Sequence, residues 1–122
     1  MLALVIDDSR TMRMILKRLL EELGFTVLQA GDGQEGLDQL DAGHLPDLML
    51  VDWNMPVMNG LTFVQTVREH PYSSTADIMM VTTETDVESI TAALAAGADE
   101  YLIKPFTNDS VATKLMALGF DL

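Results

Sequence analysis

Short apolar runs alternate with longer segments of helical periodicity along this 122-residue chain, and that alternation restricts the folds open to it. A strand that is covered on both faces loses the polar alternation of a half-exposed strand and becomes nearly continuous in apolar residues. Five runs of this kind predict buried strands: Leu2 to Ile6, Phe25 to Leu28, Leu48 to Val51, Ile78 to Val81 and Tyr101 to Ile103.

Each predicted strand is followed by a segment with apolar residues at helical spacing. In the first of these, Ser9 is a candidate N-cap and Gly24 a candidate C-terminal stop. The predicted helices cover Met12 to Leu23, Gln34 to Leu40, Leu61 to Arg68, Asp86 to Ala96 and Asn108 to Leu118. Strands that alternate with helices predict one α/β domain with a parallel sheet, covering residues 1–122 and without an effector domain.

Charge and composition exclude several classes of function. The formal net charge of −12 argues against binding to nucleic acid or an anionic membrane and favours cationic partners. The absence of cysteine excludes a disulfide framework and thiolate metal sites. No stretch has the length and apolarity of a membrane span, and no signal peptide opens the chain. We therefore expect a cytoplasmic, monomeric protein.

Polar side chains follow four of the predicted strands. Asp7 and Asp8 come after the first, Asp52 after the third, Thr82 after the fourth and Lys104 after the fifth. The carboxyl ends of strands in an open α/β sheet form its usual ligand site, so we expect these side chains to converge. Carboxylates crowded together should raise at least one pKa unless a cation intervenes. An all-oxygen ligand set favours Mg²⁺, with Mn²⁺ also possible.

This inventory suits a magnesium-assisted phosphoryl-acceptor site. Each part has a simpler alternative when taken alone: Asp7-Asp8 could be the turn before a helix, and Lys104 a solvated residue beyond an edge strand. Pro105 restricts Lys104 to extended geometry and permits a cis peptide bond. It is the matching position of the groups, at the ends of separate strands, that favours phosphoryl chemistry.

Several short motifs surround these strand-end residues. They are Asp7-Asp8-Ser9-Arg10, Asp52-Trp53-Asn54-Met55-Pro56 with Asn59-Gly60, Thr82, Gly97-Ala98-Asp99-Glu100-Tyr101 and Lys104-Pro105-Phe106. With them the chain resembles the receiver domain of two-component response regulators over essentially its whole length, above all the stand-alone receivers of the chemotaxis type. The resemblance implies a flavodoxin-like (βα)5 fold with a five-stranded parallel sheet in the order 2-1-3-4-5.

The resemblance implies that Asp52 is the phosphoacceptor, whose carboxylate takes a phosphoryl group from a phosphohistidine. It also implies an Mg²⁺ site. Asp8 and Asp52 would contribute side chains to that site, Asn54 its backbone carbonyl, and Asp7 a contact through water. Lys104 would neutralise a phosphoryl oxygen.

The resemblance further assigns a switch and a pair of residues that influence hydrolysis. Thr82 would bond a phosphoryl oxygen, and Tyr101 would swing into the vacated space. Asn54 and Glu84 stand at the two positions that flank the approach of hydrolytic water. Thr83 departs from the small residue usual beside the switch threonine, and we expect it to narrow access to the acceptor.

The partners implied are a sensor histidine kinase or phosphotransfer protein and a downstream protein. The downstream protein would bind the face formed by the fourth helix, fifth strand and fifth helix. Asp86 and Glu88 make that face more acidic than in enteric chemotaxis receivers, which argues against the same flagellar partner. A phosphorelay intermediate or phosphate sink is an alternative to motor or chemotaxis output.

Two other kinds of protein are alternatives to a receiver. A phosphatase with an aspartyl nucleophile needs a second Asp two residues after the first, where this chain has Asn54. A degenerate receiver used only for binding would have lost an acid or the lysine, and both kinds of residue are present. We therefore expect a protein that catalyses only its own phosphorylation and dephosphorylation, and not an enzyme that turns over a separate substrate.

Overall fold

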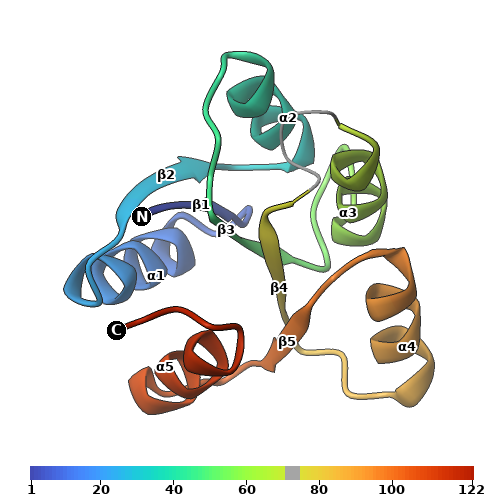
Figure 1. Cartoon of the computed structure of the whole chain (residues 1–122). Helices are drawn as coiled ribbons and strands as arrows, with labels where there is room; N and C mark the ends of the chain where they lie inside the picture. The colour runs from blue at the N-terminus through green and yellow to red at the C-terminus, as the bar shows by residue number, and fades with distance from the viewer. Residues whose placement is uncertain (71–74) are drawn as a thin grey trace.

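The computed structural model describes residues 1–70 and 75–122 and contains one parallel sheet in the order β2-β1-β3-β4-β5 (Figure 1). This confirms the predicted flavodoxin-like fold. The elements in chain order are β1 (Leu2–Ile6), α1 (Arg10–Glu22), β2 (Thr26–Ala30), α2 (Gly33–Asp41), β3 (Leu48–Asp52), α3 (Gly60–Glu69), β4 (Asp77–Thr82), α4 (Val87–Ala96), β5 (Glu100–Ile103) and α5 (Asn108–Ala117).

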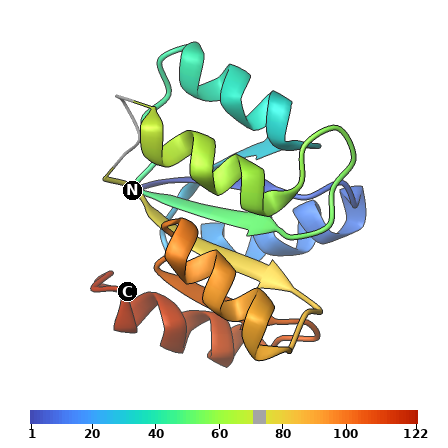
Figure 2. The same ribbon diagram turned by 90° about the vertical axis from the view of Figure 1, so that its right-hand side faces the viewer.

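Helices cover both faces of the sheet, with α1 and α5 on one side and α2, α3 and α4 on the other (Figures 1 and 2). Successive strand residues enter opposite layers of the core, as the period of a strand requires. In β1, Leu4 and Ile6 pack with Phe63 on the side of α3, whereas Ala3 and Val5 pack with Leu16 on the side of α1. Two buried layers explain why the strands read as continuously apolar.

The second strand lies further along the chain than its sequence predicts. We expected Phe25 to Leu28, but β2 begins at Thr26 and continues to Ala30, which pairs with Ile6. Phe25 ends the turn after α1 instead, because its backbone N–H donates to the Leu20 carbonyl at 3.0 Å and its ring is buried. Gln29 interrupts the apolar pattern, so the composition does not show where the strand ends. Pairing with β1 continues β2 to Ala30.

Each helix begins with a polar cap that follows the carboxyl end of a strand. The N-cap side chains of Ser9, Asp32, Asn59, Asp86 and Thr107 each accept a hydrogen bond from a backbone N–H in the first turn. Because every strand leads into a capped helix start, all five loops lie at the same edge of the sheet. None of the helices formed by the described residues is long and apolar enough to cross a membrane.

Gly60 closes the loop between β3 and α3 against the end of the strand. Its backbone N–H donates to the Trp53 carbonyl at 2.9 Å, and a Cβ at this position would collide with the Asp52 carbonyl oxygen. A side chain here would displace the backbone of Asp52 itself. Gly24 is different, since its φ of +100° demands glycine while nothing lies within 4 Å of a built Cβ.

These two glycines separate a steric cost from a conformational one. We expect Gly24→Ala to lower the free energy of unfolding by about 1 kcal/mol, the cost of a left-handed alanine. Gly60→Ala should lower it by about 3 kcal/mol, because the strand end must shift to admit the methyl group. Urea unfolding of both variants measures the difference. Equal losses would contradict the close approach of Gly60 to Asp52.

Candidate functional site

Three carboxylates meet at the carboxyl edge of the sheet. Asp7 follows β1, Asp8 comes next in the chain, and Asp52 is the last residue of β3. Each offers an oxygen atom within 4.8 Å of the others. Asp7 and Asp52 are buried, with 1% and 8% of their surface exposed, whereas Asp8 is exposed. The structure thus brings together three of the residues that the sequence singled out.

Local hydrogen bonds hold Asp7 in place. Its Oδ1 accepts from the backbone N–H of Ser9 at 2.8 Å, and its own N–H donates to the Ala30 carbonyl at 3.1 Å. Arg13 of α1 donates through one guanidinium nitrogen to the Asp7 carbonyl at 2.7 Å. The role of Arg13 was not foreseen from the sequence. Arg13 lies one turn after the N-cap of α1. The sequence would indicate its role only if α1 were known to start beside the carboxylates.

Lys104 connects the two buried carboxylates. Its Nζ lies 3.2 Å from Asp7 Oδ2 and 3.3 Å from Asp52 Oδ1. Its backbone N–H donates to the Thr82 carbonyl at 2.8 Å, which extends the pairing of β5 with β4 by one residue, and the Lys104–Pro105 peptide is cis. One ammonium against three carboxylates leaves the group two negative charges in excess.

The imbalance contributes to the pKa of Asp52. Its pKa is raised above the ordinary carboxyl value because burial disfavours the charged form and because the Asp7 carboxylate repels it. The Lys104 ammonium acts in the opposite direction, and Asp8 adds a smaller repulsion. Lys104 therefore compensates the cluster only in part.

A divalent cation of the Mg²⁺ or Mn²⁺ type fits these residues. All the ligand atoms on offer are oxygens, as hard cations prefer, and the two excess negative charges equal the charge of one such ion. Asn54, expected to contribute its carbonyl, lies in an exposed bend immediately after β3. The buried and repelled Asp52 carboxylate would gain most from the added positive charge.

Thr82 and Tyr101 both line a small cavity under α4. Its volume is about 10 Å³, and its lining includes Trp53, Thr82, Glu84, Ile90 and Tyr101. Thr82 is 3% exposed, and its Oγ1 accepts from the backbone N–H of Glu84 at 2.9 Å. The hydroxyl that was assigned to a switch is thus bonded to the loop that leads into α4.

Tyr101 has a neighbour that the sequence did not point to. Lys114 of α5 lies over its ring, with Nζ 5.1 Å from the centroid, and pairs with Glu100 at 3.0 Å. Trp53 is the other residue whose place the sequence did not predict: it lines the same cavity as Thr82 and Tyr101. Thr83, beside the switch threonine, is exposed.

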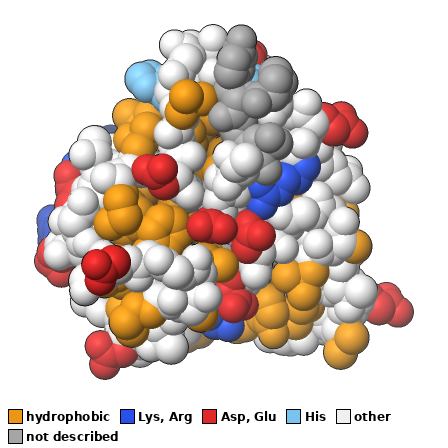
Figure 3. Space-filling model, viewed as in Figure 1, with side chains coloured by type: hydrophobic (Ala, Val, Ile, Leu, Met, Phe, Trp, Pro, Cys, Tyr) orange, Lys and Arg blue, Asp and Glu red, His pale blue; other side chains and the backbone are white. Residues whose placement is uncertain are grey.

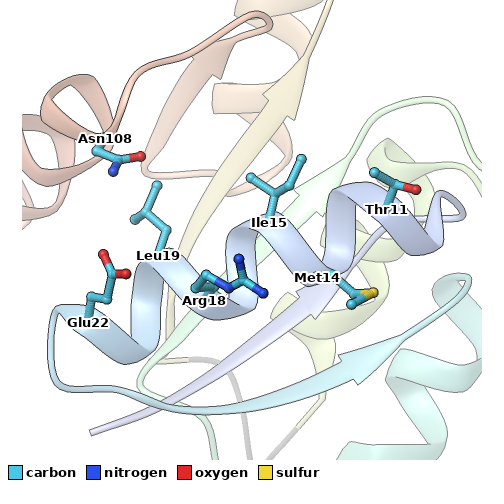
Figure 4. A pocket seen from close by; sticks show the side chains of 7 residues that line it. All are labelled: Thr11, Met14, Ile15, Arg18, Leu19, Glu22 and Asn108. Atoms are coloured by element: carbon cyan, nitrogen blue, oxygen red, sulfur yellow. The ribbon is translucent and has the colours of Figure 1, made fainter.

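A separate pocket of about 380 Å³ lies along the surface of α1 and reaches α5 (Figure 4). It contains none of the site residues predicted from the sequence. Its lining residues are Thr11, Met14, Ile15, Arg18, Leu19, Glu22 and Asn108. The carboxylate cluster is an open site at the sheet edge and does not depend on this pocket.

Comparison with known proteins gives a consistent answer. Residues 3–116 match the family model described as the response regulator receiver domain. The chain is 43% identical over 113 residues to the chemotaxis protein CheY1 of Helicobacter pylori, covering 92% of this chain and 91% of that protein. It is also 43% identical over 113 residues to the chemotaxis protein CheY homolog of Campylobacter jejuni, covering 92% and 87%. The solved structure of the chemotaxis response regulator CheY4 of Vibrio cholerae aligns with a TM-score of 0.89 at 34% identity, covering 96% of this chain and 97% of that one.

The raised pKa of Asp52 predicts a pH-dependent stability. The folded protein holds the Asp52 proton more tightly than the unfolded chain, so stability falls as the pH rises from the ordinary carboxyl value of 3.8 through the raised one. Asp52→Asn removes the charge at similar size. We expect this variant to unfold at a higher temperature than the wild type at pH 7 in metal-free buffer, with the difference disappearing below pH 3.8.

Calorimetry across pH checks this expectation. Asp121→Asn, which removes an exposed carboxylate far from the site, is the control and should leave the midpoint nearly unchanged. Added Mg²⁺ should raise the midpoint of the wild type more than that of Asp52→Asn. A lower midpoint for Asp52→Asn at pH 7 would show that the cluster is not under net repulsion.

Proposed function

The chain belongs to the response regulator receiver family, and we propose that it is a phosphoacceptor switch in which Asp52 receives a phosphoryl group from a histidine kinase or phosphotransfer protein. One observation carries this assignment. Asp52 ends a buried strand beside Asp7, with the Lys104 Nζ 3.3 Å from its carboxylate. An acceptor needs a carboxylate near the surface, a cation to meet the incoming phosphoryl oxygens and further acids to hold a metal.

The transfer exchanges one bond for another. A carboxylate oxygen of Asp52 attacks phosphorus and forms an acyl phosphate, while the bond from phosphorus to the imidazole nitrogen of the donor breaks. The departing nitrogen keeps the electron pair and takes up a proton. Negative charge is spread over the equatorial oxygens of the transition state, and Lys104 is placed to neutralise one of them.

Asp7, Asp8, Asp52 and the Asn54 carbonyl would hold Mg²⁺, which supplies positive charge to the phosphoryl oxygens when bound. The protein contributes orientation. Ser9 and Arg13 fix Asp7 through its carboxylate and its carbonyl, so the buried acid cannot turn away from the site. The carboxylates therefore need little rearrangement before transfer.

The same site limits the lifetime of the phosphoprotein. In hydrolysis, the oxygen of a water molecule bonds to phosphorus as the bond to Asp52 breaks, which returns the carboxylate and releases inorganic phosphate. Asn54 and Glu84 are the polar side chains that we assign to orienting or admitting this water. Both follow strands that end at the site, β3 and β4.

Thr82 would couple phosphorylation of Asp52 to a change of conformation around α4. Its hydroxyl now accepts from the Glu84 N–H, and it would turn to donate to a phosphoryl oxygen on Asp52. That movement enlarges the cavity of about 10 Å³ that Thr82 and Tyr101 share, so the Tyr101 ring can move inward. Phosphorylation thus shifts the population of two arrangements around α4.

The named relatives favour a role in chemotaxis, since both curated proteins at 43% identity are chemotaxis proteins. We propose that this chain signals in such a pathway by binding a protein target through α4, β5 and α5. Use as a relay intermediate or phosphate sink would employ the same chemistry at Asp52 and would differ only in the protein that receives the group.

Intact mass after incubation with a small phosphodonor and Mg²⁺ tests the acceptor. The wild type should gain one phosphoryl group, and Asp52→Asn should gain none, because an amide nitrogen is not a nucleophile of this kind. Asp47→Asn is the control: it removes a carboxylate outside the cluster, leaves Asp52 unchanged and should still gain the phosphoryl group. If Asp52→Asn still gains the group in a metal-dependent way, the acceptor is another residue.

The switch is tested through Trp53, the single tryptophan of the chain, which lines the same cavity as Thr82 and Tyr101. We expect Thr82→Ala to take up a phosphoryl group yet lose most of the phosphorylation-dependent change in Trp53 fluorescence. A hydrogen bond to a charged group contributes about 1.5–3 kcal/mol, so its loss shifts the equilibrium roughly tenfold or more. Thr82→Ser keeps the hydroxyl and should keep the change. A full response from Thr82→Ala would remove Thr82 from the switch.

A further inference from the structure

Helix α4 has the composition of a buried helix but is exposed. Glu88 is the single charged residue between Val87 and Ala96, and Ala93 is the single residue of the helix that is buried. A helix that is apolar all round is normally covered on all sides. Here 77% of Val87 and 45% of Leu94 are exposed. Apolar side chains are visible over α4 at the lower right of the molecule (Figure 3).

Three of the exposed residues of α4 form a stripe. Val87, Thr91 and Leu94 are spaced by four and three residues, which places them on one side of the helix, and all three are exposed. The opposite side contributes Ala93 to the core. A second helix laid along this stripe would cover apolar surface over the length of α4, about 15 Å.

The surroundings of the stripe are acidic. Residues 84–117, from the loop before α4 to the end of α5, contain two lysines, and both are engaged: Lys104 with Asp7 and Asp52, and Lys114 with Glu100. The same segment contains six acids, Glu84, Asp86, Glu88, Asp99, Glu100 and Asp109, of which Asp99 is paired with Arg68 of α3 and Glu100 with Lys114. Asp86 and Glu88 are exposed at the start of the helix, next to Val87.

Helix α1 differs in this respect. Of the seven Lys and Arg residues, four lie in α1: Arg10, Arg13, Lys17 and Arg18. The exposed apolar residues of that helix are Met14 and Ile15, and Figure 4 shows them with one of these cations, Arg18. These two exposed surfaces differ in charge, since α1 contains four cations and two acids whereas α4 contains one acid and no cation, so they should select partners of different chemistry.

We infer that the α4 stripe is the docking site for an amphipathic helix rich in Lys and Arg, presented by the downstream partner. This inference rests on the proposed function and adds the chemistry of the target. The apolar side of such a helix would cover Val87 and Leu94, and its cations would reach Asp86 and Glu88. A second copy of this chain is a poorer occupant, because two α4 faces would oppose like charges and a contact from α4 to α1 would not close into a symmetric dimer.

The loop before α4 is bonded to Thr82, and the far end of the helix is anchored to α3. The Glu84 N–H bonds Thr82 Oγ1 two residues before the N-cap of α4. At the far end, Arg68 of α3 donates through Nε to the Gly97 carbonyl at 2.8 Å and pairs with Asp99 at 2.7 Å. Movement of Thr82 would therefore displace the acidic start of α4 relative to a fixed end, and binding there should respond to phosphorylation.

The test uses a fluorescent amphipathic peptide of about fourteen residues, long enough to span α4, with leucines on one face and lysines on the other. A matched peptide has glutamates in place of the lysines. Anisotropy titrations at low ionic strength compare the full chain before and after treatment with phosphodonor and Mg²⁺. We expect the lysine peptide to bind, more tightly after phosphorylation, and the glutamate peptide not to bind.

Charge variants locate the binding. Asp86→Asn with Glu88→Gln should weaken binding of the lysine peptide roughly three- to tenfold, while Asn still caps the helix. Glu22→Gln with Asp121→Asn removes the same charge away from α4 and should have little effect. Leu94→Ala should weaken binding without a change in charge.

Several results would overturn the inference. Equal weakening by the two charge pairs would mean diffuse attraction to an acidic protein, and binding that ignores phosphorylation would separate the stripe from Asp52. A phosphorylated dimer in light scattering that Leu94→Ala abolishes would make a second copy the occupant. Intact mass of the same samples separates the two levels: a phosphoryl gain without selective peptide binding overturns this inference alone, and no gain overturns the proposed function with it.

Discussion

Repulsion among three carboxylates that are opposed by one ammonium is the constraint on which the rest of this structure depends. Two of the acids are buried, and burial raises the pKa of one of them, Asp52. The fold accepts this cost at the edge of its sheet because Lys104 reaches both Asp7 and Asp52. The negative charge that remains in excess suits a divalent cation, and a phosphoryl group transferred to Asp52 would change the charge at the same point.

In the proposed switch, the surroundings of this cluster would convert a change of charge into a change of conformation. Thr82 is buried beside the site and is bonded to the backbone of the loop that precedes α4. Tyr101 shares a cavity with it and is flanked by Lys114 of α5. Helix α4 is held at its C-terminal end by Arg68 and has little of itself buried. In the switch that we propose, a hydrogen bond exchanged at Thr82 would therefore act on a helix that has little of its surface packed against the core.

Much of this arrangement could be predicted from the chain. The apolar runs located the strands to within two residues, and the capping residues located the helices, because both patterns are local. Strand β2 was placed too early, since Gln29 hides the end of a strand that is recognised only by its pairing with β1. The strand order came from the resemblance to receivers. The polar strand ends named most of the site, whereas Arg13 and Lys114 were missed because nothing in the local sequence distinguishes them from surface cations.

The sequence by itself determined which residues could form strands and helices, and which reactive side chains would follow a strand end. Only the tertiary structure decided what those side chains touch. Lys104 meets Asp52 across 52 residues of chain and Asp7 across 97, and no local pattern records either distance. The same holds for burial: Asp7 and Asp8 are adjacent in sequence, yet one lies in the core and the other in solvent. Neighbouring residues at a strand end point in different directions, so packing around the sheet buries Asp7 and leaves Asp8 in solvent. This difference in burial sets the charge balance of the site.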